Sequence, residues 1–100
     1  MPGDPHEAMR KIDERLFEQV EGARRFAFSE GAIPVKYKLL IAMAIDASHG
    51  ASDGVRALAE AAMRAGARKE EIAEALRVAF YISGCGSFYT AADALGDLLG

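Results

Sequence analysis

Asp46 and His49 are the two residues whose types and spacing most suggest chemistry. Positions three apart lie on one face of a helix, so the Asp46 carboxylate can orient the His49 imidazole as a general base. Each residue also has a structural interpretation. A histidine at the carboxyl end of a helix stabilises that end. A carboxylate in an apolar helix needs a partner, and His49, Lys38, Arg56 or water at an edge can supply one. We take His49 as the candidate acid/base and Asp46 as its orienting partner.

Asp53, Cys85 and Tyr89 are predicted to line a pocket. Asp53 falls in the first turn of a predicted helix, where compensation of the helix dipole also explains it. Cys85, between two glycines, is either a reactive thiol at a helix break or a small buried filler. Tyr89 is an aromatic residue at helical spacing, which serves equally in a core or an interface. These residues give no set of three ligands at a recognised metal spacing, and no cofactor is predicted.

The element that must position the Asp46–His49 pair is a helix predicted over residues 35–48. Its residues from Leu39 to Ile45 are apolar without a polar break. A helix that is apolar all round must be covered on every side. The run is far shorter than the about 20 residues needed to cross a bilayer. We therefore predict the central buried helix of a bundle.

Four other helices are predicted from three- and four-residue apolar spacing, which gives an all-α domain of about five helices. One long helix opens at Asp4 as its cap and ends at Gly31. A second begins at Ser52 as its cap and ends at Gly66. The remaining two cover residues 69–83 and 88–99, the last capped by Ser87 after the break at Gly84, Cys85 and Gly86. No window alternates at period two for long enough to form a strand.

Composition narrows the possible partners. The chain has 100 residues, a formal net charge of −3 and one cysteine. One domain is expected at this length, and the acidic balance offers no field to attract nucleic acid or an anionic membrane. A single cysteine cannot form a disulfide within the chain, and the first residues lack the apolar segment of a secretory signal, so a cytoplasmic protein is expected. Alanine-rich helices in so small a core predict association of subunits.

Five segments, in this order and spacing, resemble the carboxymuconolactone decarboxylase family, which includes the alkyl hydroperoxidase D-like proteins. They are residues 36–42, 61–67, 70–76, 82–87 and 91–95, and the similarity covers roughly residues 15–97. The resemblance implies an all-α domain that assembles into homotrimers or homohexamers, with active sites near subunit interfaces. In the redox branch the chemistry rests on a Cys-x-x-Cys-x-x-x-His motif and a glutamate on the preceding helix.

Four positions that would carry this chemistry hold other residues here. Counting back from Gly66 places the histidine at Leu58, the cysteines at Gly54 and Ala51, and the glutamate at Leu39. None of these side chains is a nucleophile or a proton carrier. The decarboxylase branch does not need the cysteines, but the histidine at the Leu58 position is expected there too. The family's known site is therefore predicted to be degenerate.

The resulting hypothesis is a homo-oligomer whose interface pocket binds, and in an enzyme transforms, a small apolar or carboxylated molecule. Two alternatives stay open. One is a structural or interaction module, in which the apolar helices serve only assembly. The other is a thiol-dependent peroxidase, as in the redox branch of the family, which would have to rely on Cys85.

Overall fold

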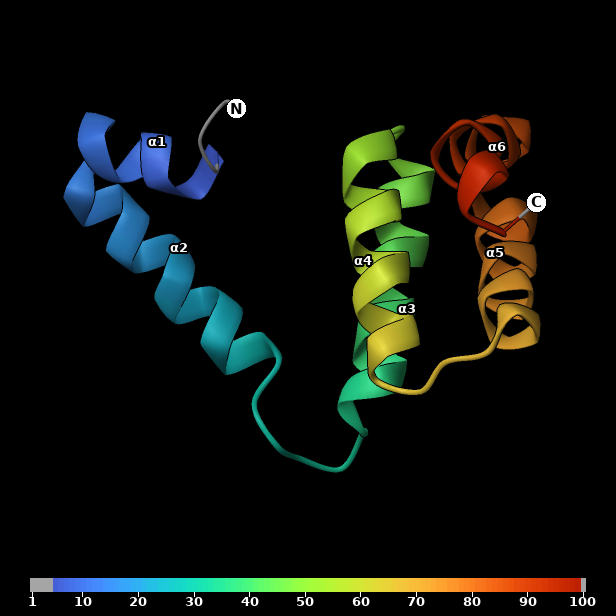
Figure 1. Cartoon of the computed structure of the whole chain (residues 1–100), viewed down its shortest axis with the longest axis horizontal. Helices are drawn as coiled ribbons and strands as arrows, with labels where there is room; N and C mark the ends of the chain where they lie inside the picture. The colour runs from blue at the N-terminus through green and yellow to red at the C-terminus, as the bar shows by residue number, and fades with distance from the viewer. Residues whose placement is uncertain (1–4, 100) are drawn as a thin grey trace. The chain divides into compact units, whose positions relative to one another are not determined.

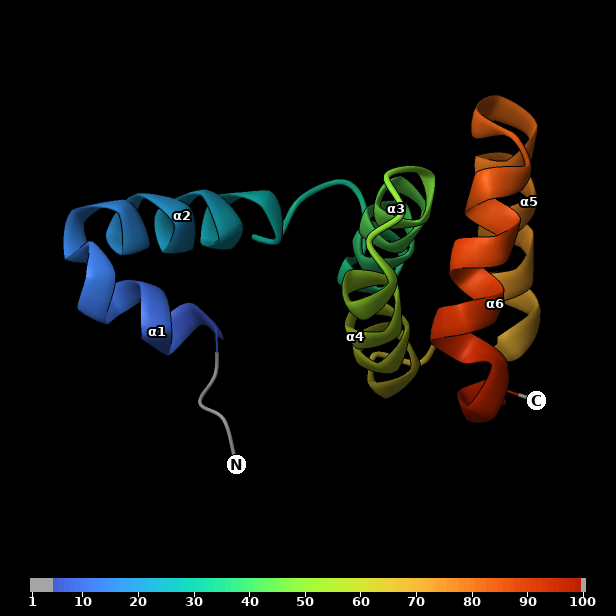
Figure 2. The ribbon, with the colours of Figure 1, turned by 90° about the horizontal axis from the view of Figure 1, so that it is seen from above.

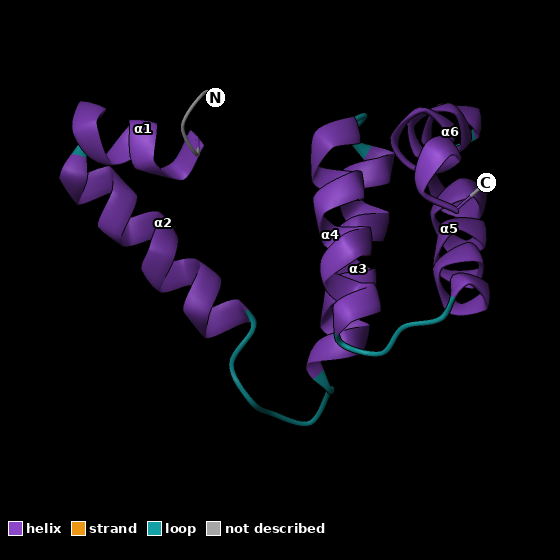
Figure 3. Ribbon diagram, viewed as in Figure 1, coloured by secondary structure: helices purple, strands orange, loops and turns teal. Residues whose placement is uncertain are grey.

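All regular structure in the computed structural model, which describes residues 5–99, is helical (Figures 1 and 3). The helices are α1 (Pro5–Ile12), α2 (Glu14–Ala27), α3 (Val35–Ser48), α4 (Ser52–Arg64), α5 (Lys69–Ser83) and α6 (Cys85–Leu99). The all-α prediction is confirmed. Residue contacts group the chain into two units, Met1–Glu30 and Gly31–Gly100, and each is described by itself.

The prediction of a single long helix from Asp4 to Gly31 is wrong. The first unit forms two helices, α1 and α2, in its place. The break falls at Asp13, whose extended backbone and side chain cap α2 by accepting a hydrogen bond from the backbone N–H of Leu16 at 3.0 Å. Aspartate competes in this way with the helical backbone, so it favours a cap over a helix interior. The proposed cap Asp4 lies outside the described residues.

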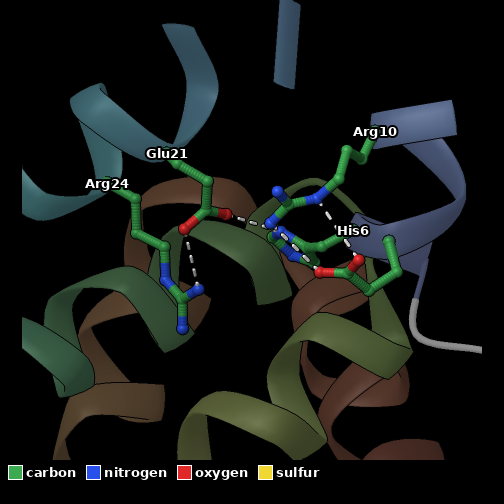
Figure 4. Close-up of polar contacts among 5 residues, drawn as sticks. His6, Arg10, Glu21 and Arg24 are labelled. Carbon is green, nitrogen blue, oxygen red and sulfur yellow. Dashed lines mark hydrogen bonds and ion pairs between the residues drawn. The ribbon is translucent and has the colours of Figure 1, made fainter. Parts of the chain in front are cut away.

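Polar contacts at the surface hold α1 against α2. Glu21 of α2 lies 2.9 Å from the ring of His6 and 3.6 Å from the guanidinium of Arg24 (Figure 4). Arg10 pairs with Glu7 in its own helix and lies over the ring of Phe17. No residue of α2 is buried. The described part of this unit, residues 5–30, therefore has amphipathic helices but no core.

The second unit is a four-helix bundle centred on α3, which contacts α4, α5 and α6. In Figure 2, α3 lies beside α4, and α5 beside α6. The side chains of Met43, Val55 and Ile72 are fully buried in its core. In the single chain α3 is not covered on every side, since Ile41 and Ile45 remain 48% and 51% exposed. The prediction assigned the remaining cover to a second subunit. The three neighbouring helices surround only part of the α3 circumference.

Helix ends in this unit follow the sequence closely, with two corrections. The predicted bounds of α3 and α5 are confirmed. Ser52 is the first residue of α4 rather than its cap, a position held by Ala51. The last helix begins at Cys85 rather than residue 88, because only Gly84, with φ of 88°, interrupts the chain. Ser87 is thus inside the first turn, where it is buried and its hydroxyl donates to the Gly84 carbonyl at 2.8 Å.

None of the helices within residues 5–99 has both the length and the apolar character that crossing a membrane requires.

Candidate functional site

Asp46 lies near the end of α3 and its carboxylate reaches the first turn of α4. Its Cγ is 2.9 Å from the position that a Cβ on Gly54 would occupy, so the carboxylate fills the space that a side chain at Gly54 would need. The Asp46 carbonyl accepts hydrogen bonds from the backbone N–H groups of His49 and Ala51, which closes the turn between the helices. A negative charge beside the first turn of a helix is favourable. Glycine at 54 and aspartate at 46 therefore form one packed unit.

His49 is the carboxyl-terminal cap of α3 and is exposed. The structure brings it into the same turn as Asp46, but within residues 5–99 no hydrogen bond joins the His49 ring to the Asp46 carboxylate. The orienting contact predicted for this pair is not made in this conformation. His49 is placed to stabilise the last carbonyls of α3 and is open to solvent on one side.

Asp53 lines a shallow cavity of about 390 Å³ together with Arg56 and Asp97. The Arg56 guanidinium lies 2.6 Å from the Asp97 carboxylate and also donates to the carbonyl of Ala94. The hydrogen bond from Arg56 lowers the pKa of Asp97, and the same contact raises the pKa of Arg56. Arg56 therefore forms its ion pair with Asp97 and is not the partner of Asp46. Asp53 and Asp93 also line the cavity, so its wall carries three carboxylates and one guanidinium.

Cys85 and Tyr89 both lie on the first turns of α6, where each is exposed. Tyr89 packs edge to face against Phe88, with ring centroids 5.2 Å apart. Neither residue is among those that line the cavity containing Asp53, although Asp93, one turn after Tyr89 on α6, is. Asp53 is thus the one of the three predicted pocket residues that lines this cavity.

A pair that the sequence analysis missed joins α3 to α5. The Lys36 ammonium lies 3.2 Å from the Glu71 carboxylate, and both side chains are largely covered. Glu71 also accepts a hydrogen bond from the backbone N–H of Arg68 at 2.9 Å. That bond first, and Lys36 second, lower the pKa of Glu71, and the hydrogen bond to Glu71 raises the pKa of Lys36. An acidic residue three positions after the cap residue, here Arg68, was a usable signal.

Two apolar grooves run along α5. The α3–α5 groove, of about 700 Å³, has an apolar floor that includes Ile41 and Ile45, and its charged residues are Arg68, Glu71 and Glu74. The α5–α6 groove, of about 600 Å³, is lined by the residues Lys69, Ile72, Ala73, Leu76, Arg77, Phe80, Phe88, Ala91, Ala92, Leu95, Gly96 and Leu99. Both volumes fall in the range typical of small-molecule sites. Both grooves are larger than the cavity of about 390 Å³ that Asp53 lines.

The positions assigned to a redox motif have structural roles. Leu39 and Leu58 pack against the buried core, Ala51 caps α4, and Gly54 accommodates Asp46. Within the described part of the chain, no group of three histidine, cysteine, aspartate or glutamate side chains is placed to hold a metal ion.

A protein-family model matches most of the chain. The model is that of the carboxymuconolactone decarboxylase family, and it covers residues 14–97. The match begins at the first residue of α2 and extends almost to the end of α6. Comparison with curated proteins gives no significant match.

Proposed function

The chain belongs to the carboxymuconolactone decarboxylase family, and from this premise we propose a homo-oligomer without dithiol peroxidase activity. Its subunits, three or six in number, meet through apolar helix faces. A pocket at the interface receives a small apolar or carboxylated molecule. The alternative of a pure assembly module differs only in leaving that pocket empty.

The observation that carries this proposal is the large apolar surface of a single chain. At the end of α5, Val78, Tyr81 and Ile82 are 64%, 85% and 76% exposed. Phe88 and Tyr89 follow at the start of α6, and Ile41 and Ile45 of α3 are half exposed. Monomeric proteins rarely expose so many large apolar side chains close together in the chain, and such surfaces mark interaction sites. A second subunit of the same kind is the simplest cover.

The absence of dithiol chemistry is proposed from the side chains at the motif positions. A dithiol peroxidase needs two cysteines that can close a disulfide, and this chain has one cysteine. Cys85 is exposed at the start of α6, remote in sequence from the positions of the motif. The proposal leaves the remaining chemistry, if there is any, to the pocket and to the Asp46–His49 turn.

Native mass spectrometry of freshly purified protein tests the proposal directly. A trimer or hexamer with excess mass in near-integer steps per subunit is the expected result, and the excess mass identifies the ligand. A trimer or hexamer without excess mass favours the assembly module. A monomer contradicts the oligomer and removes the proposed interface pocket.

Peroxide consumption with a dithiol reductant tests the third possibility. We expect no turnover above a protein-free control, for the wild type and for Cys85→Ser alike. Turnover that disappears in Cys85→Ser would establish a single-cysteine peroxidase and contradict this part of the proposal.

A further inference from the structure

The α5–α6 groove differs from the α3–α5 groove in the sign of its charged residues. Among the described residues 5–99, the charged residues that line it are Lys69 and Arg77, and both are cations. The α3–α5 groove instead mixes Arg68 with Glu71 and Glu74. In a chain with 15 acidic and 12 basic residues, an apolar groove edged only by cations is an unusual arrangement. Its charge complements an anion.

The two cations are free to bind such an anion. Within residues 5–99, neither Lys69 nor Arg77 makes an ion pair with a carboxylate. The nearby acids are engaged or turned elsewhere: Glu70 pairs with Arg68, Glu71 with Lys36, and Asp97 with Arg56. Asp93 lines the shallow cavity shared with α4 rather than this groove.

The floor of the groove suits an alkyl chain. Ile72, Leu76 and Phe80 recur every four residues along α5, and Phe88 and Leu95 face them from α6. From Lys69 to Phe80 the helix rises about 16 Å. Small alanine and glycine residues between the larger side chains keep the groove open along this length. An extended chain of methylenes fits such a floor, with a charged end beside one of the two cations.

We propose that the α5–α6 groove binds a medium-chain alkyl carboxylate, its chain over Leu76 and Phe80 and its carboxylate beside Arg77 or Lys69. This inference rests on the proposed function, because it places the proposed pocket at the α5–α6 groove and names its ligand class. It requires no chemical step.

Titration of the delipidated full-length protein with octanoate, decanoate and the uncharged decan-1-ol tests the proposal. We expect saturable binding that tightens about two- to fourfold per added methylene, as burial of each methylene requires. The double variant K69Q/R77Q should raise the Kd of decanoate about five- to tenfold and leave that of decan-1-ol unchanged. The matched control K11Q/R64Q removes the same charges outside the groove and should leave both unchanged.

Two filling variants locate the ligand. Ala73 lines only the α5–α6 groove and Ala44 only the α3–α5 groove. Ala73→Leu should abolish binding of decanoate and decan-1-ol, whereas Ala44→Leu should preserve both, with helical content checked by circular dichroism.

Four results would overturn the proposal. The first two are no saturable binding of decanoate, or equal weakening of decanoate and decan-1-ol binding by K69Q/R77Q. The other two are loss of binding in Ala44→Leu only, or an Ala73→Leu variant that changes the subunit number without changing ligand binding. The last result would assign the groove to a second copy of the chain. A different bound mass in the native spectrum, with no decanoate binding, would overturn this ligand class and leave the proposed function standing. A monomer with no bound mass would remove the proposed function itself.

Discussion

The α1–α2 unit and the α3–α6 unit both consist of helices, yet within residues 5–99 only the second has a core. In α2 the stripe residues Leu16 and Val20 remain 46% and 47% exposed, and nothing in that helix is buried. In the bundle, Met43, Val55 and Ile72 have no exposed surface. An apolar stripe makes a helix amphipathic, but burial needs enough neighbours to surround a side chain. Two helices do not suffice, and four do.

Truncation of one apolar side chain in each unit should give the largest contrast. Ile72→Ala removes buried methyl groups and leaves a cavity, so we expect a loss of about 2–5 kcal/mol in the free energy of unfolding. Leu16→Ala removes a half-exposed side chain and should cost less than about 1 kcal/mol. Urea unfolding at one fixed protein concentration measures both. Equal losses of unfolding free energy in the two variants would mean that the apolar stripe of α2 is buried when subunits assemble. The difference in burial between the two units would then hold only for an isolated chain.

Glycine-to-alanine substitutions should change the unfolding free energy in opposite directions in the two units. Gly54→Ala places a methyl group where the Asp46 carboxylate lies, so we expect destabilisation by about 1–2 kcal/mol. Gly22→Ala in α2 meets nothing closer than Arg25 at 4.0 Å. It should stabilise the helix by about 0.5–1 kcal/mol, since alanine is the better helix former. Thermal unfolding of the two variants and the wild type shows whether each substitution stabilises or destabilises the protein.

A double variant isolates the Asp46–Gly54 contact. In an Asp46→Ala background the methyl group has room, so Gly54→Ala should become neutral or stabilising. The interaction energy from the four proteins measures the contact itself. Destabilisation of the same size in both backgrounds would show that the backbone at Gly54, rather than Asp46, demands glycine.

The helices themselves were predictable, and their surroundings were not. The bounds of α3 and α5 follow from apolar runs and flanking glycine or acidic residues, which act locally. Asp13 escaped prediction because an aspartate in an amphipathic stretch suits either a surface position or a cap, and only the backbone geometry decides. The pattern of one chain cannot specify what covers Ile41 and Ile45, which are half exposed in the single chain.

The candidate site shows the same division. The neighbouring positions of Asp46 and His49 in one turn could be read from their spacing, whereas the contact of Asp46 with Gly54 depends on how α4 returns along α3. The groove between α5 and α6 combines residues up to 30 positions apart, from Lys69 to Leu99. No local pattern marks such a surface before the two helices are packed.

Ion pairs give a smaller contrast, visible in the dependence on pH. Lys36–Glu71 joins two helices of the bundle, whereas Arg10–Glu7 lies within one helix of the first unit. The pKa of Glu71 is lowered in the folded chain. Its contribution is therefore present above the pKa of an unfolded glutamate, about 4.3, and is lost as the pH falls through and below that value. Glu71→Gln should flatten the decline of unfolding free energy with acid.

Glu74→Gln is the matched control, one turn along the same face of α5 and without an ion pair to a cation within residues 5–99. It should keep the acid decline of the wild type. The two variants should also differ in salt, since only Glu71→Gln removes a pair that salt can screen. Identical acid profiles for the two variants would show that the Lys36–Glu71 pair contributes nothing measurable.

The smallest expected effect concerns the two histidines, one in each unit. His49→Ala removes a side chain at the carboxyl end of α3 and should lower the unfolding free energy by about 0.5 kcal/mol. His6→Ala removes an exposed contact with Glu21 and should change it by a similar or smaller amount. Stability therefore cannot separate a structural His49 from a functional one, but turnover can. If His49 acts as acid or base, any turnover found on the identified ligand should fall in His49→Ala by a factor of at least 10², while His6→Ala should retain it. Equal turnover in both variants would mean that His49 has only a structural role at the carboxyl end of α3.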